Sequence, residues 1–545
     1  MEDSYILDRE YEEFNRLPEL KSHLGSLAVG ALAASPFRKH VVDLAQERKE
    51  LSSGMILAVA LAMGQRWKET IPDQRVGVVF PAGLGGILTN LALTLIDKVP
   101  VNFNFSAGRA AVETAFAIGR VNKLISAGPV REKVPDFPWP DDMIDLVGER
   151  THINKKDVLK KLALITLLPT RVLLKRFGVP TEGGNREAGL LFSSGSTGSP
   201  KGIPLTHRNV IANCLQIKSC RLLNREQVLL ACLPTFHSFG FTATMWYPLL
   251  HGVRCVTLPS PLETRKIAEA IEAEKVTIMM GTPTFLRPYF KRARTEQLAP
   301  LKYVVSGAEK TPPGLAERWE RHFGSLYLEG YGLTETSPVV SVNLPEMPGR
   351  PAEKKPGSVG RLLPGMRARV VDPATGEVLP VNRRGILDLQ GANVFKGYLN
   401  DREATDRVFH DGWFRTGDLA RIDGEGYLFI EGRVSRFSKL GGEMIPHGRL
   451  EQIIAECFHL EDAESPLVAV TGISDDAKGE ALVLLAAVEI RAEELRARLL
   501  KAGIPNLWVP RIILRVDSIP SLASGKLDLK ALDALAVRKM RENTH

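Results

Sequence analysis

Cysteine is scarce in this chain, and its scarcity excludes two kinds of architecture. The 545 residues include five cysteines, an odd number without a single Cys-x-x-Cys pair. A disulfide framework and a thiolate zinc site both require more cysteines at closer spacing. Neither is expected, and we predict that the protein resides in a reducing compartment.

Internal repeats, low-complexity tracts and an export signal are also missing. The first thirty residues carry acids where a signal peptide carries a basic and then an apolar stretch. The longest run without charged residues or histidine, Val76 to Ile96, contains Pro81 and three glycines soon after it. We therefore interpret this run as a buried strand, a turn and a helix rather than a membrane span. A cytoplasmic protein is expected, with contact at the inner face of the membrane as an alternative.

The length and the order of the apolar runs predict an α/β protein with two domains. A chain this long exceeds what one compact core holds. From Val76 onward, short β-branched runs alternate with helical segments, which is typical of sheets flanked by helices. Short strands broken by glycine and proline between Gly357 and Gly391 predict a small barrel-like unit. A further change at Gly432 and Arg433 predicts a boundary between a large N-terminal domain, 1–432, and a small α+β domain, 433–545.

The net charge of +8 is concentrated in the N-terminal part. Residues 433–545 hold 16 basic and 16 acidic residues, so the excess precedes them. The segment from His152 to Arg176 pairs one acid, Asp157, with seven basic residues: Lys155, Lys156, Lys160, Lys161, Arg171, Lys175 and Arg176. Apolar residues recur in it at helical spacing, so it predicts either a membrane-surface helix or a packed helix with a solvated face. No aromatic residue interleaves with these charges, and no nucleic-acid partner is expected.

One glycine- and hydroxyl-rich segment predicts a phosphate site. It reads Phe192-Ser-Ser-Gly-Ser-Thr-Gly-Ser-Pro-Lys-Gly202 and follows two leucines. Glycines let backbone N–H groups approach an anion, hydroxyls add donors, and a lysine adds charge. The spacing is not that of a Walker loop. The predicted phosphate ligands are Ser193, Ser194, Gly195, Ser196, Thr197, Gly198 and Lys201.

Five further motifs follow in order along the chain. They are Leu233-Pro-Thr-Phe-His237, Tyr331-Gly-Leu-Thr-Glu335, Gly412-Trp-Phe-Arg-Thr-Gly-Asp418, Gly432-Arg433 and Ser524-Gly-Lys526. Together with the glycine-rich segment, they resemble the adenylate-forming superfamily of acyl-CoA synthetases, luciferases and peptide-synthetase adenylation domains. Within it, segments such as Ser306-Gly-Ala-Glu-Lys310 look most like the acyl-(acyl carrier protein) synthetase half of the bifunctional 2-acylglycerophosphoethanolamine acyltransferase/synthetase.

The resemblance implies a role for each matching residue in forming an acyl adenylate from ATP. Glu335 would hold the Mg²⁺ on ATP and Thr334 would donate to phosphate. Lys526 would bridge the acyl carboxylate and the phosphate during adenylation. Asp418 would accept both ribose hydroxyls, and Arg433 would hold ribose or phosphate.

The remaining matches border the substrates or the hinge. Tyr331 and the backbone of Gly307 and Ala308 would border the adenine, and His237 would lie at the entrance to the acyl site. The family's usual Lys-Asp hinge pair is replaced here by Ser435 and Arg436, so Arg436 is the candidate pivot. Two glycines, Gly441 and Gly442, begin the face that would serve the thioester step.

The residues around His237 indicate the class of acid. The stretch Pro234 to Tyr247 is rich in Phe, Trp, Met and Ala and contains no Asp or Glu. An amino-acid site needs a carboxylate for the substrate ammonium, so an uncharged acyl chain is favoured. We predict a fatty acid ligase that transfers the acyl group to the phosphopantetheine of acyl carrier protein, or else to CoA. The alternatives are an aryl-acid CoA ligase and a catalytically silent membrane scaffold that binds ATP and acyl groups.

Overall fold

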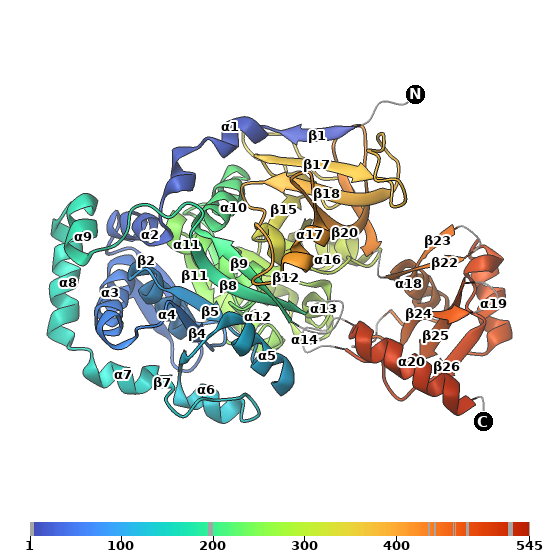
Figure 1. Cartoon of the computed structure of the whole chain (residues 1–545), viewed down its shortest axis with the longest axis horizontal. Helices are drawn as coiled ribbons and strands as arrows, with labels where there is room; N and C mark the ends of the chain where they lie inside the picture. The colour runs from blue at the N-terminus through green and yellow to red at the C-terminus, as the bar shows by residue number, and fades with distance from the viewer. Residues whose placement is uncertain are drawn as a thin grey trace.

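The computed structural model shows a mixed α/β protein with a large N-terminal domain and a smaller C-terminal domain (Figure 1). The residues that it describes are 5–194, 200–433, 436–440, 443–461, 463, 465–475, 479–521 and 527–543. Within these ranges, no helix combines the length and the apolar character that crossing a bilayer requires.

The first sheet has six strands and is parallel except for its last pair. In spatial order they are β7 (Ile144–Asp145), β6 (Lys123–Ser126), β4 (Arg75–Val78), β5 (Val99–Asn102), β8 (Glu187–Ser194) and β9 (Pro200–Thr206). The run from Val76 to Ile96 forms β4, a turn and α4 (Leu84–Leu95), as predicted. In the antiparallel β8–β9 pair, Ser193 is opposite Lys201.

The second sheet has nine strands, and its six central ones are parallel. In spatial order the nine are β16 (Arg361–Leu362), β15 (Val339–Val342), β14 (Leu326–Gly332), β13 (Tyr303–Ser306), β12 (Ile278–Gly281), β10 (Val228–Ala231), β11 (Arg254–Thr257), β2 (Lys39–Asp43) and β3 (Lys49–Ser52). The residues that follow β12, β13 and β14 therefore meet at one edge of the sheet, where α/β proteins bind ligands.

The third sheet is antiparallel and open, which corrects the predicted barrel-like unit. Its strands are β1 (Ile6–Arg9), β17 (Met366–Val371), β18 (Gly385–Gly391), β20 (Trp413–Ile422), β19 (Phe409–His410) and β21 (Leu428–Arg433). Both β19 and β21 pair with β20, at its two ends, while β1 pairs with β17 at the far side of the sheet. In the described part of the chain no pairing joins β1 to β19 or β21, so the sheet does not close.

Helices cover the sheets of the N-terminal domain. They are α1 (Tyr11–Asn15), α2 (Leu24–Ala33), α3 (Ser53–Thr70), α4, α5 (Arg109–Gly119), α6 (Gly128–Lys133), α7 (Leu146–His152), α8 (Lys155–Leu167), α9 (Thr170–Phe177), α10 (His207–Ser219), α11 (Tyr247–His251), α12 (Thr264–Glu274), α13 (Pro283–Leu286), α14 (Tyr289–Arg292), α15 (Thr295–Leu298), α16 (Leu315–Phe323) and α17 (Arg402–Val408). In α3, Ile56, Ala60, Met63 and Trp67 are buried at helical spacing, and Ala58 and Ala62 on the opposite side are buried too, so most of this helix lies within the main core.

The C-terminal domain has its own apolar core. A sheet of β24 (Val468–Asp475), β25 (Gly479–Ala486) and β26 (Ile512–Arg515) accompanies a hairpin of β22 (Phe437–Leu440) and β23 (Glu443–Pro446), with helices α18 (His447–Cys457), α19 (Ala492–Lys501) and α20 (Leu529–Asn543). The two apolar clusters here begin at Leu440, whereas no residue beyond Ile430 belongs to the main cluster of the large domain. The two parts of the chain thus bury their apolar side chains separately.

Candidate active site

The predicted nucleotide residues meet where the second and third sheets adjoin. Tyr331 lies on β14, and Thr334 and Glu335 follow in a 3₁₀ turn, Thr334–Thr336. Asp418 lies on β20 opposite Arg433, the last residue of β21. Tyr331 and Asp418, 87 positions apart in the sequence, are therefore brought together where two separate sheets adjoin, not by local structure.

The carboxylate of Asp418 is held by hydrogen bonds from two directions. The Tyr331 hydroxyl donates to Oδ2, and Arg433 Nε donates to Oδ1 at 3.1 Å. The Asp418 side chain is only 4% exposed, whereas that of Arg433 is 57% exposed. Burial raises the pKa of Tyr331 well above its ordinary value, and the Asp418 charge raises the pKa of Arg433. The phenol therefore stays a donor and Arg433 a cation, so Asp418 is held as an oriented anion.

A second group of side chains is centred on Glu335. The Tyr398 hydroxyl donates to Glu335 Oε1 at 3.0 Å, and the Lys201 ammonium lies 4.6 Å from the centre of the Tyr398 ring. Removal from water raises the pKa of Glu335; the Asp418 charge also raises it, while the Arg433 charge lowers it. The two groups therefore affect each other electrostatically. A cation bound at Glu335 would favour its charged form.

The other matching residues lie beside these groups. Thr334 Oγ1 accepts a hydrogen bond from Ser238 Oγ at 3.4 Å, which brings the neighbouring His237 close to Thr334. His237 is exposed, packs on Phe236 with ring centres 4.7 Å apart, and precedes a buried π-helical segment, Phe239–Trp246. Such segments occur often at functional sites.

The turn after β13 differs in conformation from an ordinary helix or strand end. Ala308 has a φ of 66°, in the left-handed region, and Gly307 N–H donates to the carbonyl of Gly281 at 3.1 Å. Because β13 ends at Ser306, the backbone of both residues lies at the edge of the second sheet where α/β proteins commonly bind ligands.

Several predicted site residues cannot be placed. Gly195, Ser196, Thr197, Gly198, Gly441, Gly442 and Lys526 lie outside the described residues, and only the backbone of Ser194 is described. Arg436 lies in the small domain and donates to Glu451 Oε2 at 2.5 Å and to the Val470 carbonyl at 3.4 Å. Arg436 and Glu451 form a half-buried ion pair within that domain.

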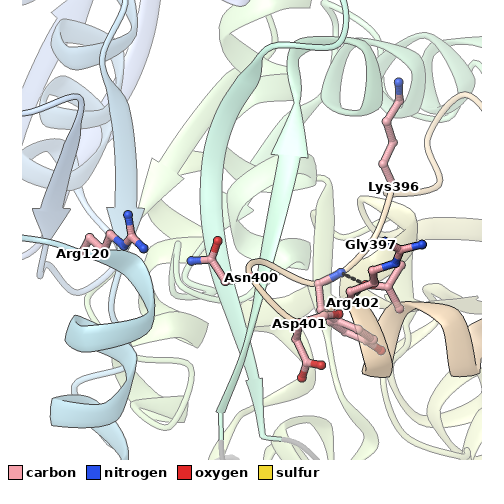
Figure 2. A pocket seen from close by; sticks show the side chains of 8 residues that line it. Arg120, Lys396, Gly397, Asn400, Asp401 and Arg402 are labelled. Atoms are coloured by element: carbon pink, nitrogen blue, oxygen red, sulfur yellow. Dashed lines mark hydrogen bonds between the residues drawn. The ribbon is translucent and has the colours of Figure 1, made fainter.

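Tyr398 and the cavity beside it lie outside the sequence motifs. The cavity has a volume of about 630 Å³. Figure 2 shows Arg120, at the end of α5, across from the loop before α17. Its lining residues are Arg120, Lys396, Gly397, Tyr398, Asn400, Asp401, Arg402 and Thr405. Asp401 is engaged as the N-cap of α17, accepting from Ala404 N at 2.9 Å. Three basic residues therefore border a cavity that Tyr398 connects to Glu335, although no sequence pattern relates residue 120 to residues 396–405.

A His23, Asp97 and His207 group elsewhere has the composition of a metal site but not its chemistry. Both imidazole Nδ1 atoms accept backbone N–H groups, from Gly25 at 3.1 Å and from Leu24 at 3.2 Å. Asp97 forms an ion pair with Arg186 at 2.7 Å. With Nδ1 engaged as an acceptor, each neutral ring carries its proton on Nε2, so the group is a structural support for the start of α2.

Comparison with known proteins extends these observations. The chain is 31% identical over 354 residues to luciferin 4-monooxygenase of Photuris pensylvanica, covering 63% of each protein. It is 31% identical over 352 residues to a long-chain-fatty-acid–CoA ligase of Bacillus subtilis, covering 62% of this chain and 60% of the ligase. The chain thus matches less than two thirds of the length of these relatives.

The fold and the family follow from two further matches. ATP-bound MatB from Rhodopseudomonas palustris superimposes with a TM-score of 0.74 at 22% identity, covering 94% of this chain and 98% of MatB. The large and small domains seen here therefore have the same arrangement of elements as a solved structure. Residues 57–399, more than half of the chain, match the AMP-binding enzyme family, and the protein belongs to that family.

Proposed function

We propose that the protein is an AMP-forming ligase that activates a fatty acid with ATP and transfers it to a thiol. The observation that carries this proposal is the oriented Asp418 anion beside the group of Glu335, Tyr398 and Lys201. The Asp418 carboxylate can accept the ribose hydroxyls of a nucleotide. The charged side chains of Glu335 and Lys201 beside it suit the magnesium ion and the phosphates of a nucleotide whose α-phosphate reacts. The acid-free, largely buried stretch Pro234 to Tyr247 supports an apolar acyl chain.

The two steps are an exchange at phosphorus and an exchange at carbon. First, a carboxylate oxygen of the acid attacks the α-phosphorus of ATP, and pyrophosphate leaves with the bonding electron pair. Second, the thiol sulfur attacks the acyl carbon, its proton passes to water, and AMP leaves. Asp418 would orient the ribose through its hydroxyls, while Lys201 and Thr334 would offset negative charge near the phosphates.

Glu335 fits a magnesium ion. Its carboxylate is a hard oxygen donor, and a cation would offset the raised pKa that removal from water causes. When bound, the ion would neutralise charge on the phosphates of ATP. Tyr398 would hold the carboxylate in place.

We propose that the domain boundary lies between residues 432 and 433 and that the small domain moves between the two steps. The separate apolar clusters support two bodies. Arg436, paired with Glu451, would then belong to the moving body, and a role for it as pivot remains part of this proposal.

Asp418→Asn is expected to raise the KM for ATP by about 10- to 100-fold while changing kcat much less. The amide lacks the negative charge that pairs with Arg433, and it offers the ribose one acceptor oxygen instead of two. A hydrogen bond to a charged group contributes about 1.5–3 kcal/mol to binding, which corresponds to this change in KM. The measurement is ATP–pyrophosphate exchange at saturating acid. Asp411→Asn, at an exposed position of the same hairpin, is the matched control. An unchanged KM for ATP in Asp418→Asn would remove Asp418 from the nucleotide site.

We propose acyl carrier protein as the thiol acceptor, and CoA as the second candidate, which the name of the Bacillus relative favours. The resemblance of the Ser306 to Lys310 segment and the net charge of +8 support an acidic protein acceptor. With holo acyl carrier protein and CoA offered together, acyl carrier protein should be the main product, and its rate should fall with added salt. A large preference for CoA, or a rate with the carrier protein that salt leaves unchanged, would reject this acceptor.

ATP–pyrophosphate exchange with a panel of acids tests the activity itself. Exchange with fatty acids supports the proposal, and exchange with aryl acids alone would indicate an aryl-acid ligase. A protein that binds ATP without any exchange would be the silent scaffold.

A further inference from the structure

Helices α8 and α9 form an outer edge of the N-terminal domain. Figure 1 shows them at the left of the molecule, at the end of its long axis opposite the small domain. Val158, Lys161 and Ile165 of α8 and Leu173 of α9 are buried against the domain. The outward sides of both helices therefore remain uncovered.

Basic side chains occupy this outward side, which we name the α8–α9 face. Six of the seven basic residues of the segment are exposed: Lys155, Lys156, Lys160, Arg171, Lys175 and Arg176. The seventh, Lys161, is buried and bonded to Asp157 at 2.5 Å, which corrects its assignment to the basic side. Because Asp157 is the single acid between His152 and Arg176, this pairing leaves the face cationic.

Large apolar side chains protrude among these charges. Leu167 is 77% exposed, Leu159 59% and Val172 46%. Phe37, 70% exposed, follows Pro36, and Pro36 and Leu162 of α8 both approach Gly54 so closely that an added Cβ would lie 2.8 Å from each. Leu159, Leu167 and Val172 are three of the twelve exposed large apolar side chains of the described residues, and all three lie on α8 and α9.

We propose that the α8–α9 face binds reversibly to an anionic membrane surface. Lys156, Lys160, Ala163 and Leu167 follow one another at spacings of four, three and four residues, so cations and an apolar side chain share one stripe of α8 opposite its buried side. Such a stripe lets lysines meet lipid phosphates while the leucine enters the interface. Protruding, separated apolar side chains suit a fluid interface better than an acidic protein, which would need a shaped contact.

Sedimentation with vesicles tests the proposal on the full chain. The protein should bind vesicles of phosphatidylcholine mixed with phosphatidylglycerol, bind pure phosphatidylcholine much more weakly, and dissociate as salt rises. Each basic residue near an anionic leaflet strengthens binding about fivefold, so the pair Lys156→Glu and Lys160→Glu should weaken it at least about 25-fold. The pair Leu159→Ser and Leu167→Ser should weaken it about tenfold without a change in charge.

Matched controls lie on α12 and beside it. Arg265→Glu with Lys266→Glu makes the same change in charge at exposed positions. Leu262→Ser removes a leucine side chain that is 62% exposed. These variants should bind as the parent does, and thermal unfolding checks the fold of all of them. The proposal is overturned if the parent does not bind anionic vesicles or if the controls weaken binding equally. It is also overturned if the α8 variants bind holo acyl carrier protein more weakly than the parent does while their binding to anionic vesicles is unchanged. None of these readouts depends on the proposed ligase activity.

Discussion

Glu335→Gln is expected to lower ATP–pyrophosphate exchange by about 10²–10³-fold, a loss typical of removing one preorganised electrostatic group. The amide keeps the shape of the side chain and can still accept the Tyr398 hydroxyl, which now lies 3.0 Å from Oε1. It lacks the negative charge that would hold magnesium at the phosphates. Tyr398→Phe, which keeps the carboxylate and removes only its hydrogen bond, should cost about tenfold or less.

Glu335→Gln should also make the ligand-free protein more stable at neutral pH. The folded-state pKa of Glu335 is raised, chiefly by removal from water, so the folded state binds more protons than the unfolded state between the ordinary and the raised pKa. Stability therefore falls as pH rises through that interval, and a neutral glutamine avoids this loss. Thermal unfolding with and without ATP and magnesium measures it. A less stable variant, or one with full exchange activity, would contradict the role given to Glu335.

Activity of the parent should decline on acidification sooner than a solvent-exposed glutamate would allow. The charged form of Glu335 is the one that holds a cation, and its raised pKa means that protonation begins at higher pH. A pH profile of exchange at saturating ATP measures the decline, and saturating magnesium should shift it to lower pH because metal binding competes with the proton. A profile that magnesium does not shift would argue against metal binding at this carboxylate.

Lys526→Ala is expected to abolish acyl-adenylate formation while sparing the transfer of a supplied acyl adenylate to the thiol. Its assignment rests on the Ser524-Gly-Lys526 motif, because residue 526 lies outside the described residues. A lysine charge between the acyl carboxylate and the α-phosphate offsets repulsion only while the phosphorus is attacked, and it is not needed once the adenylate exists. Exchange should fall about 10³-fold or more, with the second step changed less than about tenfold.

The comparison of the two half-reactions provides the control for this variant. A misfolded protein loses both steps, so retained transfer from acyl adenylate shows that the fold is intact. Lys530→Ala, four residues later on α20, should leave both steps unchanged. Equal loss of both steps in a folded Lys526→Ala protein would mean that this lysine does not act on adenylation alone.

The spacing of apolar residues, together with the glycines and prolines that interrupt it, predicts the helices and strands that depend on local sequence. The run after Val76 folds as strand, turn and helix, as predicted, because proline and glycines interrupt it. The barrel-like unit was wrong because short alternating strands do not reveal which edges meet. Edge pairing depends on partners far away in the chain, such as β1 with β17.

For the candidate site, too, the sequence predicts which residues take part but not the contacts that distant parts of the chain form. Ordered motifs predict that Tyr331, Glu335, Asp418 and Arg433 belong together, and the structure brings them together. Motifs do not state which atom meets which, so the Tyr331 to Asp418 bond and the contact of Lys201 with Tyr398 emerge only from the fold. The sequence around Tyr398 offers only a glycine, Gly397, followed by an aromatic residue in the loop before α17, and this pair does not by itself indicate a site.

The pairing of β1 with β17 places a constraint on how the chain folds as it is synthesised. Residues 6–9 lie some 360 positions before their partners, residues 366–369, and therefore leave the ribosome well ahead of them. At about 5–20 residues per second, the first strand waits roughly 20–70 s for its hydrogen-bonding partner. During that time the third sheet does not exist, and Arg9 and Asp8 lack the ion-pair partners Glu353 and Arg367. The third sheet, which holds Asp418, is consequently completed only after the strands of the two parallel sheets have been synthesised, and the small domain follows it.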